Sequence, residues 1–189
     1  QTPSGTVLGV RQRAGYGTLV AISPSGEATD LGQLHPGYTA LSTPAAAPTG
    51  EKVALLVAGG KQPGRVVVFD LAGKPPAHAI IRRSDTETVP ASALSAPEPV
   101  SWKSFDGEHA HGLYYPPASE GFEGTGAPPL IVIIHGGPTS QVVAGWAAQA
   151  QYFATRGYAV LFPNYRGSTG YGRDYMLKLR ESWGIYDVQ

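Results

Sequence analysis

Residues 130–138 read LIVIIHGGP, five apolar residues followed by a glycine turn. The apolar run does not alternate with polar residues, which predicts a central parallel strand over residues 130–134 with both faces covered by helices. A stretch that permits a helix follows over residues 141–156, and Gly157 stands where a helix end is expected. Residues 158–162 form a second apolar run. Strand, helix and strand in this order predict a βαβ crossover, the unit of an open α/β sheet.

The sequence before this unit has a different pattern. Residues 100–105 and 110–115 flank an Asp-Gly pair and predict a β-hairpin. Up to about residue 99, short apolar runs alternate with turn residues and no window is long enough for a helix, which indicates antiparallel β-structure. A generic sandwich and one or two blades of a β-propeller both agree with this spacing. The runs cover residues 18–22, 52–58, 65–71 and 78–81.

Composition narrows the function. The chain has 14 basic and 14 acidic residues, so no net field attracts nucleic acid or an anionic membrane, and neither is expected as a partner. No apolar run approaches the ~18 residues of a membrane span. The absence of cysteine excludes disulfides and thiolate catalysis, and with no signal pattern at the start it predicts a cytoplasmic location. Neutral charge is compatible with a monomer or a homo-oligomer.

The glycine turn is the first candidate site. It follows a predicted parallel strand, and ligands of open α/β sheets bind beyond the carboxyl ends of the strands. Two glycines let the backbone turn sharply and leave amide hydrogens unshielded, and Pro138 has no amide hydrogen to donate. The amide of Gly137 is therefore the candidate oxyanion donor, with His135, Gly136 and Pro138 shaping the turn. A donor of this kind contributes about 2.7–4 kcal/mol in acyl transfer. A plain Gly-Gly turn is the alternative.

Residues 164–173, NYRGSTGYGR, directly follow the second apolar run and should lie on the same sheet edge. The glycine spacing imitates a phosphate loop, but Arg173 and Asp174 stand where Lys and Ser/Thr are needed, so no nucleotide cofactor is expected. We interpret the stretch as a glycine-hinged loop at the edge of the site. Arg166 is predicted to brace this loop or a neighbouring carboxylate rather than contact substrate. The residues assigned to the edge loop are Asn164, Tyr165, Arg166 and Gly167.

His109 and His111 alternate on one predicted strand and could imitate a pair of metal ligands. No third ligand stands at a suitable spacing, so a surface or interdomain role is preferred and no metal site is predicted.

Several motifs in the second half of the chain together resemble the prolyl oligopeptidase family of serine peptidases, in particular its acylaminoacyl-peptidase and dipeptidyl-peptidase-like members. The resemblance implies β-propeller blades over residues 1–99, followed by the N-terminal part of an α/β-hydrolase catalytic domain over residues 100–189. It also implies a Ser-Asp-His triad acting on short peptides, with Gly137 supplying one oxyanion amide. The motifs are FDG at 105–107, HGLYYP at 111–116, HGGP at 135–138, residues 164–171, and Trp183-Gly184.

The nucleophile of such a domain is missing from the sequence. No serine has glycine two residues before and two residues after it, and Ser168 has Arg166 in the upstream position. Because the acid and the base follow the nucleophile in this fold, the whole triad is expected beyond residue 189 and His135 is not the base. We therefore expect an interrupted domain that is inactive alone and requires the remainder of the catalytic domain.

Three functions remain open for the intact protein. The first is a serine peptidase that hydrolyses short peptides. The second is a carboxylesterase of the same fold, against which the β-rich first half argues. The third is a non-catalytic, propeller-type binding module with a decayed hydrolase domain. A G-x-S-x-G motif within about one further βα unit would separate the first two from the third.

Overall fold

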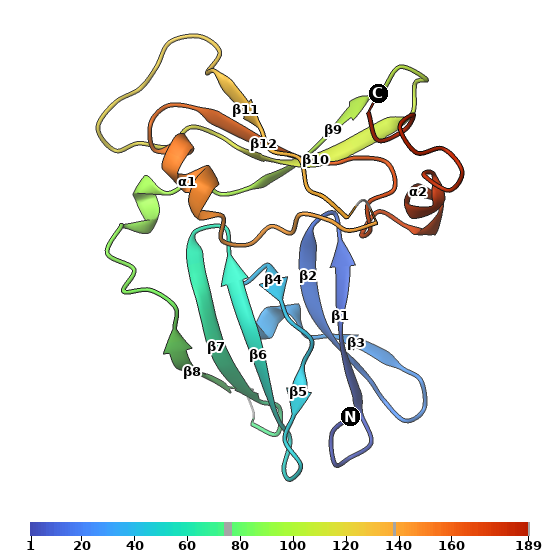
Figure 1. The fold of residues 1–189 in the computed structure, drawn as a ribbon. Coiled ribbons are helices and arrows are strands. Elements are labelled where there is room, and N and C mark those ends of the chain that lie inside the picture. Colours follow the sequence, from blue (N-terminus) through green and yellow to red (C-terminus); the bar gives the residue numbers. More distant parts are fainter. Residues whose placement is uncertain (74–76, 138, 189) are drawn as a thin grey trace.

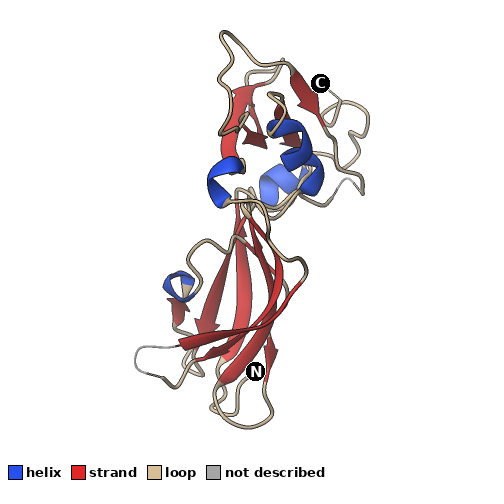
Figure 2. Ribbon diagram, turned by 90° about the vertical axis from the view of Figure 1, so that its left-hand side faces the viewer, coloured by secondary structure: helices blue, strands red, loops and turns tan. Residues whose placement is uncertain are grey.

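The computed structural model describes residues 1–73, 77–137 and 139–188. Figure 1 shows two parts, which we call the lower part (strands β1–β8) and the upper part (strands β9–β12 with helices α1 and α2). The structure is mostly β-sheet with few helices, and Figure 2 shows the long strands of the lower part meeting the upper part at their ends. Short 3-10 turns occur at Gly32–Leu34 and Ala91–Ala93.

The lower part consists of two antiparallel sheets. One has three strands in the order β1-β2-β3, and the other has the order β4-β6-β7-β8 with β5 also paired to β6. The four apolar runs predicted as strands correspond to β2, β6, β7 and β8, which confirms the antiparallel prediction. The strands are β1 Val7–Arg13, β2 Tyr16–Ile22, β3 Ala28–Asp30, β4 Ala40–Leu41, β5 Ala45–Ala46, β6 Lys52–Gly59, β7 Gln62–Asp70 and β8 Ala77–Arg83.

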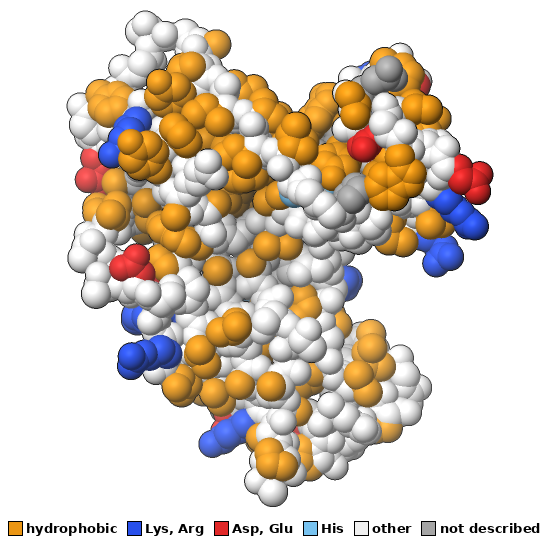
Figure 3. All heavy atoms as spheres, in the orientation of Figure 1, with side chains coloured by type: hydrophobic (Ala, Val, Ile, Leu, Met, Phe, Trp, Pro, Cys, Tyr) orange, Lys and Arg blue, Asp and Glu red, His pale blue; other side chains and the backbone are white. Residues whose placement is uncertain are grey.

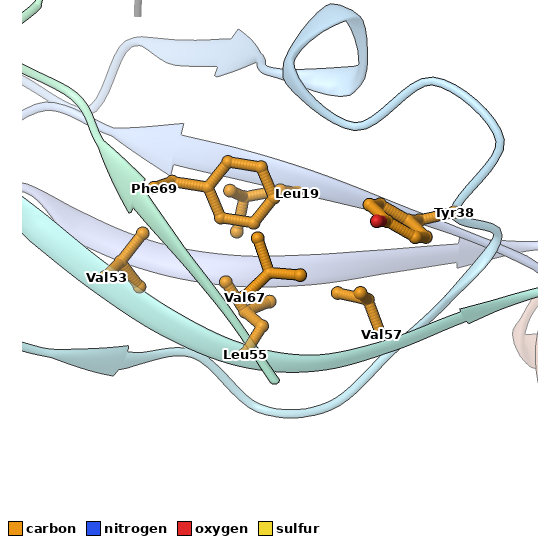
Figure 4. Packing of buried hydrophobic residues seen from close by; sticks show 7 residues of the cluster. All are labelled: Leu19, Tyr38, Val53, Leu55, Val57, Val67 and Phe69. Carbon is orange, nitrogen blue, oxygen red and sulfur yellow. The ribbon is translucent and has the colours of Figure 1, made fainter. Parts of the chain in front are cut away.

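The core of the lower part is built by alternate residues of its strands. Val53, Leu55 and Val57 of β6 are at most 2% exposed, whereas Leu56 between them is 61% exposed, because successive strand side chains point to opposite faces of a sheet. The cluster is completed by side chains from β2, β7 and the loop before β4 (Figure 4), namely Leu19, Val67, Phe69 and Tyr38.

The upper part contains a four-stranded sheet in the order β11-β12-β10-β9. β11 and β12 run parallel with α1 between them in the chain, and β9 and β10 form the predicted hairpin. Both the parallel crossover and the hairpin are thus confirmed. The elements are β9 Glu98–Lys103, β10 His109–Tyr115, β11 Leu130–Val132, α1 Ala148–Ala154, β12 Ala159–Asn164 and α2 Arg173–Leu177.

The prediction that residues 130–134 form a covered central strand is wrong for this chain. Within the described residues β11 pairs only with β12 and lies at the edge of the sheet. Leu130 and Val132 are 52% and 49% exposed, and Ile134 beyond the strand is 69% exposed. The strand ladder nevertheless extends one residue further, because the Ile133 amide donates to the Leu161 carbonyl at 2.9 Å.

Both predicted helices are shorter than the sequence indicates. The helix expected over residues 141–156 spans only α1, because backbone groups before it form hydrogen bonds outside any helix. Val142 bonds to the Asn164 side chain, and the Ala144 amide donates to the Gly15 carbonyl. The sequence also predicts a helix from Asp174 to Trp183, and this helix reduces to the five residues of α2, followed by turns.

The two parts touch through hairpin ends. The β1–β2 turn reaches the upper part, where the Ala14 amide donates to the Gly170 carbonyl at 3.0 Å. The β6–β7 turn reaches α1, where the Gln151 side chain donates to the Gly60 carbonyl at 2.9 Å. Among the described residues no strand pairing connects β1–β8 with β9–β12. The domain boundary near residue 99 remains a prediction.

Candidate active site

The two loops singled out in the sequence lie against each other at one sheet edge. Because β11 and β12 are parallel, the chain leaves both strands at the same edge. Several hydrogen bonds then join the two loops, and three of them are spread along the length of the loops. These are His135 Nε2 with Ser168 Oγ at 3.0 Å, the Thr169 amide to the Ser140 carbonyl at 2.8 Å, and the Val142 amide to Asn164 Oδ1 at 2.7 Å.

Gly137 lies in the open part of the turn. Its φ of +68° is a left-handed conformation that glycine adopts without a steric penalty. A Cβ at this position would meet no atom within 4 Å, and the residue is exposed. Within the described part of the chain, the Gly137 amide donates to no acceptor. The amide is therefore available to an incoming group, and its role as an oxyanion donor remains a prediction. Pro138 lies outside the described residues.

His135 is held from three directions. Its ring stacks on Tyr165 with centroids 4.6 Å apart and an interplanar angle of 15°. Nε2 is 3.0 Å from Ser168 Oγ, and Nδ1 is 3.1 Å from the Gly136 carbonyl. A proton on Nδ1 would satisfy both contacts, with Nδ1 donating to Gly136 and Nε2 accepting from the Ser168 hydroxyl. The ring thereby connects the glycine turn to the edge loop.

Tyr165 also fixes the backbone of His135. Its hydroxyl donates to the His135 carbonyl at 3.0 Å. Burial, and to a smaller extent the negative charge of Asp187, raise the pKa of Tyr165. The phenol therefore keeps its proton at neutral pH and remains a donor.

Ser168 does not have the surroundings of a nucleophile. It is fully buried, and its amide donates to the Tyr165 carbonyl at 2.9 Å, as in a turn. Although its hydroxyl is bonded to a histidine, no carboxylate of the described residues bonds that histidine in turn. A triad requires an exposed serine and a base oriented by a third group. The geometry agrees with a structural Ser-His pair.

Asn164 fastens the end of β12 to the segment before α1. The side chain is fully buried. Its Oδ1 accepts from the Val142 amide, and its Nδ2 donates to the Val142 carbonyl and the Tyr171 hydroxyl, each at 3.0 Å. The Tyr175 hydroxyl donates to the Asn164 carbonyl at 2.6 Å. Every polar atom of this amide group is thus used within the site.

Arg166 is buried at the opposite side of the edge loop. Its guanidinium, 1% exposed, pairs with the Asp106 carboxylate and donates to Ser104 Oγ at 3.0 Å. Its charge also lies over the rings of Phe105 and Tyr186. The predicted contact with a carboxylate is therefore present, and the absence of a substrate contact remains a prediction.

The ion pair with Arg166 favours the charged form of the Asp106 carboxyl group. Burial acts to raise the pKa of Asp106, but hydrogen bonds from the Glu108 amide and from Arg166 outweigh burial and lower it. Gly167, next to Arg166, is packed so closely that a Cβ would lie 2.2 Å from Leu179 Cδ1. The edge loop is thus fixed to the β9–β10 turn on one side and to the chain after α2 on the other.

The two histidines of β10 lie in an aromatic cluster. His111 stacks on Tyr171 with centroids 4.5 Å apart, and the centroid of the His109 ring is 6.5 Å from that of His111. Burial, followed by the neighbouring His109, lowers the pKa of His111. Residues 1–73, 77–137 and 139–188 contain no group of three or more His, Asp or Glu residues arranged to hold a metal ion.

On the face seen in Figure 3, hydrophobic side chains gather over the upper part, and the Lys and Arg side chains lie mainly along the outline of the molecule. None of the helices in the described structure is long and apolar enough to cross a bilayer.

Sequence reasoning missed one group of residues near the site. The turn Ala14–Gly15 and Thr39 of the lower part bond directly to the segments that form the two loops. Their residue types carry no signal for this role, because the contacts join positions more than 100 residues apart in the chain. Only the folded arrangement reveals them.

The fold and the site together have two features that can be compared with known proteins. A β-rich part with two antiparallel sheets precedes a sheet with a parallel βαβ unit, and at the carboxyl ends of the parallel strands stands a glycine turn whose Gly137 amide has no acceptor among the described residues.

Comparison with known proteins matches part of the chain to one family. The model of the prolyl oligopeptidase family matches residues 145–189. The chain is 36% identical over 94 residues to the uncharacterized peptidase YuxL of Bacillus subtilis, covering 50% of this chain and 14% of that protein. It is 44% identical over 61 residues to the human acylamino-acid-releasing enzyme, covering 32% of this chain and 8% of that enzyme.

A solved structure extends the likeness to nearly the whole chain. A puromycin-hydrolyzing peptidase of Mycobacterium tuberculosis superposes with a TM-score of 0.82 and 30% identity, over 96% of this chain and 27% of that one. Residues 145–189 thus match the prolyl oligopeptidase family, which confirms the resemblance inferred from the sequence, and the sheet-rich lower part fits the propeller of such proteins. The chain spans about a quarter of the length of this solved relative.

Proposed function

We propose that this chain is part of a serine peptidase that hydrolyses short peptides, of the acylaminoacyl- or dipeptidyl-peptidase type. In this proposal residues 1–99 are the C-terminal part of a β-propeller and residues 100–189 are the N-terminal part of an α/β-hydrolase domain. The triad Ser, Asp and His lies outside these residues. The observation that carries the proposal is the exposed Gly137 amide, which donates to no described residue and lies at the carboxyl ends of two parallel strands.

The role of Gly137 follows from the chemistry of acyl transfer. Attack of the serine hydroxyl on a peptide carbonyl places negative charge on the carbonyl oxygen, and a fixed amide hydrogen stabilises this charge. The histidine base takes the proton of the serine and returns it to the leaving amine, while the aspartate orients the histidine. The Gly137 amide is one donor, and the amide of the residue after the nucleophile is the second.

His135 and Asn164 hold this donor in place. The stacked, hydrogen-bonded ring of His135 fixes the start of the glycine turn, and the Asn164 amide fixes the segment that follows it. Preorganisation of this kind matters because a donor that must first be oriented stabilises the transition state less. The chain alone supplies half of an oxyanion hole and no nucleophile, so we propose that it is inactive without the remainder of the domain.

The class of enzyme can be tested on the full-length protein. A fluorophosphonate probe should label one serine in a G-x-S-x-G motif located after residue 189, within about one further βα unit. Absence of labelling would contradict a serine hydrolase and support the binding-module alternative. A panel of acyl-amino-acid, dipeptidyl and simple ester substrates then separates a peptidase from a carboxylesterase, which would hydrolyse only the esters.

The role of the Gly137 amide needs a change that removes the hydrogen and keeps the conformation. Proline is unsuitable because its ring fixes φ near −65°, whereas Gly137 has φ +68°. Replacing Gly137 by glycolic acid exchanges the amide for an ester and retains the backbone angles. Loss of one oxyanion donor is worth about 100- to 1000-fold in kcat, and we expect a decrease of that size.

The matched control is the same exchange at Gly136. That residue is equally exposed and its amide is not assigned a role, so kcat should change little. Equal losses at both positions would show that ester replacement disturbs the turn as a whole, and unchanged turnover at Gly137 would contradict the oxyanion assignment.

A further inference from the structure

The segment after the glycine turn is held by both parts of the molecule. We call residues 142–145 the anchor segment. From the upper part, Asn164 bonds both backbone groups of Val142, and the Tyr115 hydroxyl donates to the Gly145 carbonyl at 3.0 Å. From the lower part, the Gly15 carbonyl accepts from the Ala144 amide at 2.7 Å, and the Thr39 hydroxyl donates to the Ala144 carbonyl.

The backbone of Thr39 is held by hydrogen bonds within the lower part. The Thr39 carbonyl accepts from the Gly17 amide at 2.7 Å, and the Thr39 amide donates to the Ala58 carbonyl at 2.9 Å. Because Gly17 belongs to β2 and Ala58 to β6, Thr39 is fixed to both sheets of the lower part. Any movement of these sheets would therefore be transmitted to Ala144.

The contact is too close to accommodate a shift. Ala144 is fully buried. A Cβ on Gly15 would lie 3.2 Å from Leu113 Cδ1 and 3.3 Å from the Val142 carbonyl, and a Cβ on Gly145 would lie 2.8 Å from that of Ala40. Backbones approach this closely only where glycine leaves room. The packing fixes the distance between the parts, and the hydrogen bonds fix their register.

The same hairpin turn also binds the second loop of the site. The Ala14 amide donates to the Gly170 carbonyl at 3.0 Å, while Gly15 accepts from Ala144. Neighbouring residues of one turn thus contact the second loop and the anchor segment, which the hydrogen bonds between Asn164 and Val142 join to each other. The glycine turn ends only a few residues before the anchor segment.

We propose that the Ala14–Gly15 turn and Thr39 are positioning residues for the oxyanion loop. The lower part would hold the anchor segment and the edge loop in fixed positions relative to each other. It would thereby fix the position of the Gly137 amide. This inference rests on the proposed function, because it assigns the lower part a contribution to the same transition state.

Thr39→Val in the full-length protein tests the inference. Valine keeps the shape of threonine and removes the hydroxyl that binds Ala144. Misplacement of catalytic groups by about 1 Å costs roughly 100-fold in rate, so we expect kcat to fall by about 10- to 100-fold. KM should stay nearly unchanged, because the role proposed for Thr39 is to hold the anchor segment. Thr39→Ser restores the hydroxyl and should restore kcat. Thr43→Val, at an exposed threonine after β4, is the matched control and should leave kcat unchanged.

Amide hydrogen exchange gives a second measurement that does not depend on activity. In Thr39→Val the Ala144 amide should exchange faster than in the wild-type protein and in Thr43→Val, while amides in β6 and β7 keep their rates. Unchanged exchange at Ala144 would overturn the structural part of the inference. Faster exchange with unchanged kcat would overturn the link to turnover.

The two proposals fail in different ways. If the wild-type protein neither reacts with a fluorophosphonate nor hydrolyses any substrate of the panel, the proposed function is wrong, and the link to turnover with it. The exchange comparison still decides whether the lower part holds the anchor segment. If the wild-type protein is active and Thr39→Val is equally active, only the positioning role is wrong.

Discussion

Replacement of Asn164 by alanine should make local opening of the candidate site at Val142 more frequent. Asn164 is the only asparagine of the chain, and its buried side chain makes three hydrogen bonds, two to Val142 and one to the Tyr171 hydroxyl. Alanine removes all three hydrogen bonds at once. The amide and carbonyl of Val142 are then left without a side-chain partner next to a position that is fully buried.

The size of the effect follows from these contacts. A buried polar group that loses its partner costs about 1–3 kcal/mol, so two backbone groups should cost about 2–4 kcal/mol after partial relaxation. Since each 1.4 kcal/mol is a factor of ten, local opening at Val142 should become about 30- to 1000-fold more frequent. The Val142 amide, whose acceptor in the described structure is Asn164 Oδ1, reports this opening directly.

The assay is native-state hydrogen exchange of the full-length protein, read at Val142 and at amides of β6 as an internal reference. Gln149→Ala serves as the control, because it shortens an exposed amide side chain on α1. An exchange rate at Val142 within about threefold of the wild-type rate would be far below the expected effect and would contradict this prediction. A uniform increase throughout the molecule would show global destabilisation instead of local opening.

Two further predictions concern neighbouring residues. Ser168→Ala should retain full fluorophosphonate labelling, because the Ser168 side chain is buried and bonded to His135; loss of labelling would identify Ser168 as the nucleophile. His111 should make the fold sensitive to mild acid. Burial and the neighbouring His109 lower the pKa of His111 in the folded state from its ordinary value of 6.5. Below about pH 6.5 the unfolded chain therefore binds a proton at His111 more strongly than the folded chain does. The contribution of His111 to the free energy of unfolding is complete above that pH and declines as the pH falls toward the lowered pKa. Urea midpoints measured between about pH 7.5 and 5 should fall less in His111→Phe than in the wild-type protein, and equal slopes would contradict this account.

Local patterns in the sequence were sufficient to predict most strands. The apolar run in Lys52–Gly59 and the β-branched run in Gln62–Asp70 are each followed by turn residues, which predicts strands, and both form strands. The helix predicted over residues 141–156 failed in its first half for a reason that no local pattern contains. Its backbone groups are bonded to Gly15 and to the Asn164 side chain, which the fold brings in from other segments.

The site was predictable in its position but not in its connections. The apolar runs before His135 and Asn164 implied parallel strands, and therefore two loops at one edge, which the pairing of β11 with β12 confirms. The hydrogen bond between His135 and Ser168 was not foreseen, because neither residue type specifies its partner. The contact of Thr39 with Ala144 was equally hidden, since it depends on the packing of the lower part against the upper part.

Strand β11 shows why sequence and structure disagree about the centre of the sheet. Edge strands of natural proteins usually carry charges or proline, which discourage pairing with another strand. β11 carries neither, and Leu130 and Val132 are 52% and 49% exposed at the open edge. Its composition suits a strand with neighbours on both sides, whereas β12 is the one neighbour that the described residues supply. In the proposed α/β-hydrolase domain, the strand that leads to the nucleophile would pair with this edge and cover these side chains. That arrangement would place the serine beside the Gly137 amide. The uncharged, proline-free composition that makes β11 a poor edge strand is thus what would let it pair with the strand that leads to the nucleophile, as the proposed oxyanion hole requires.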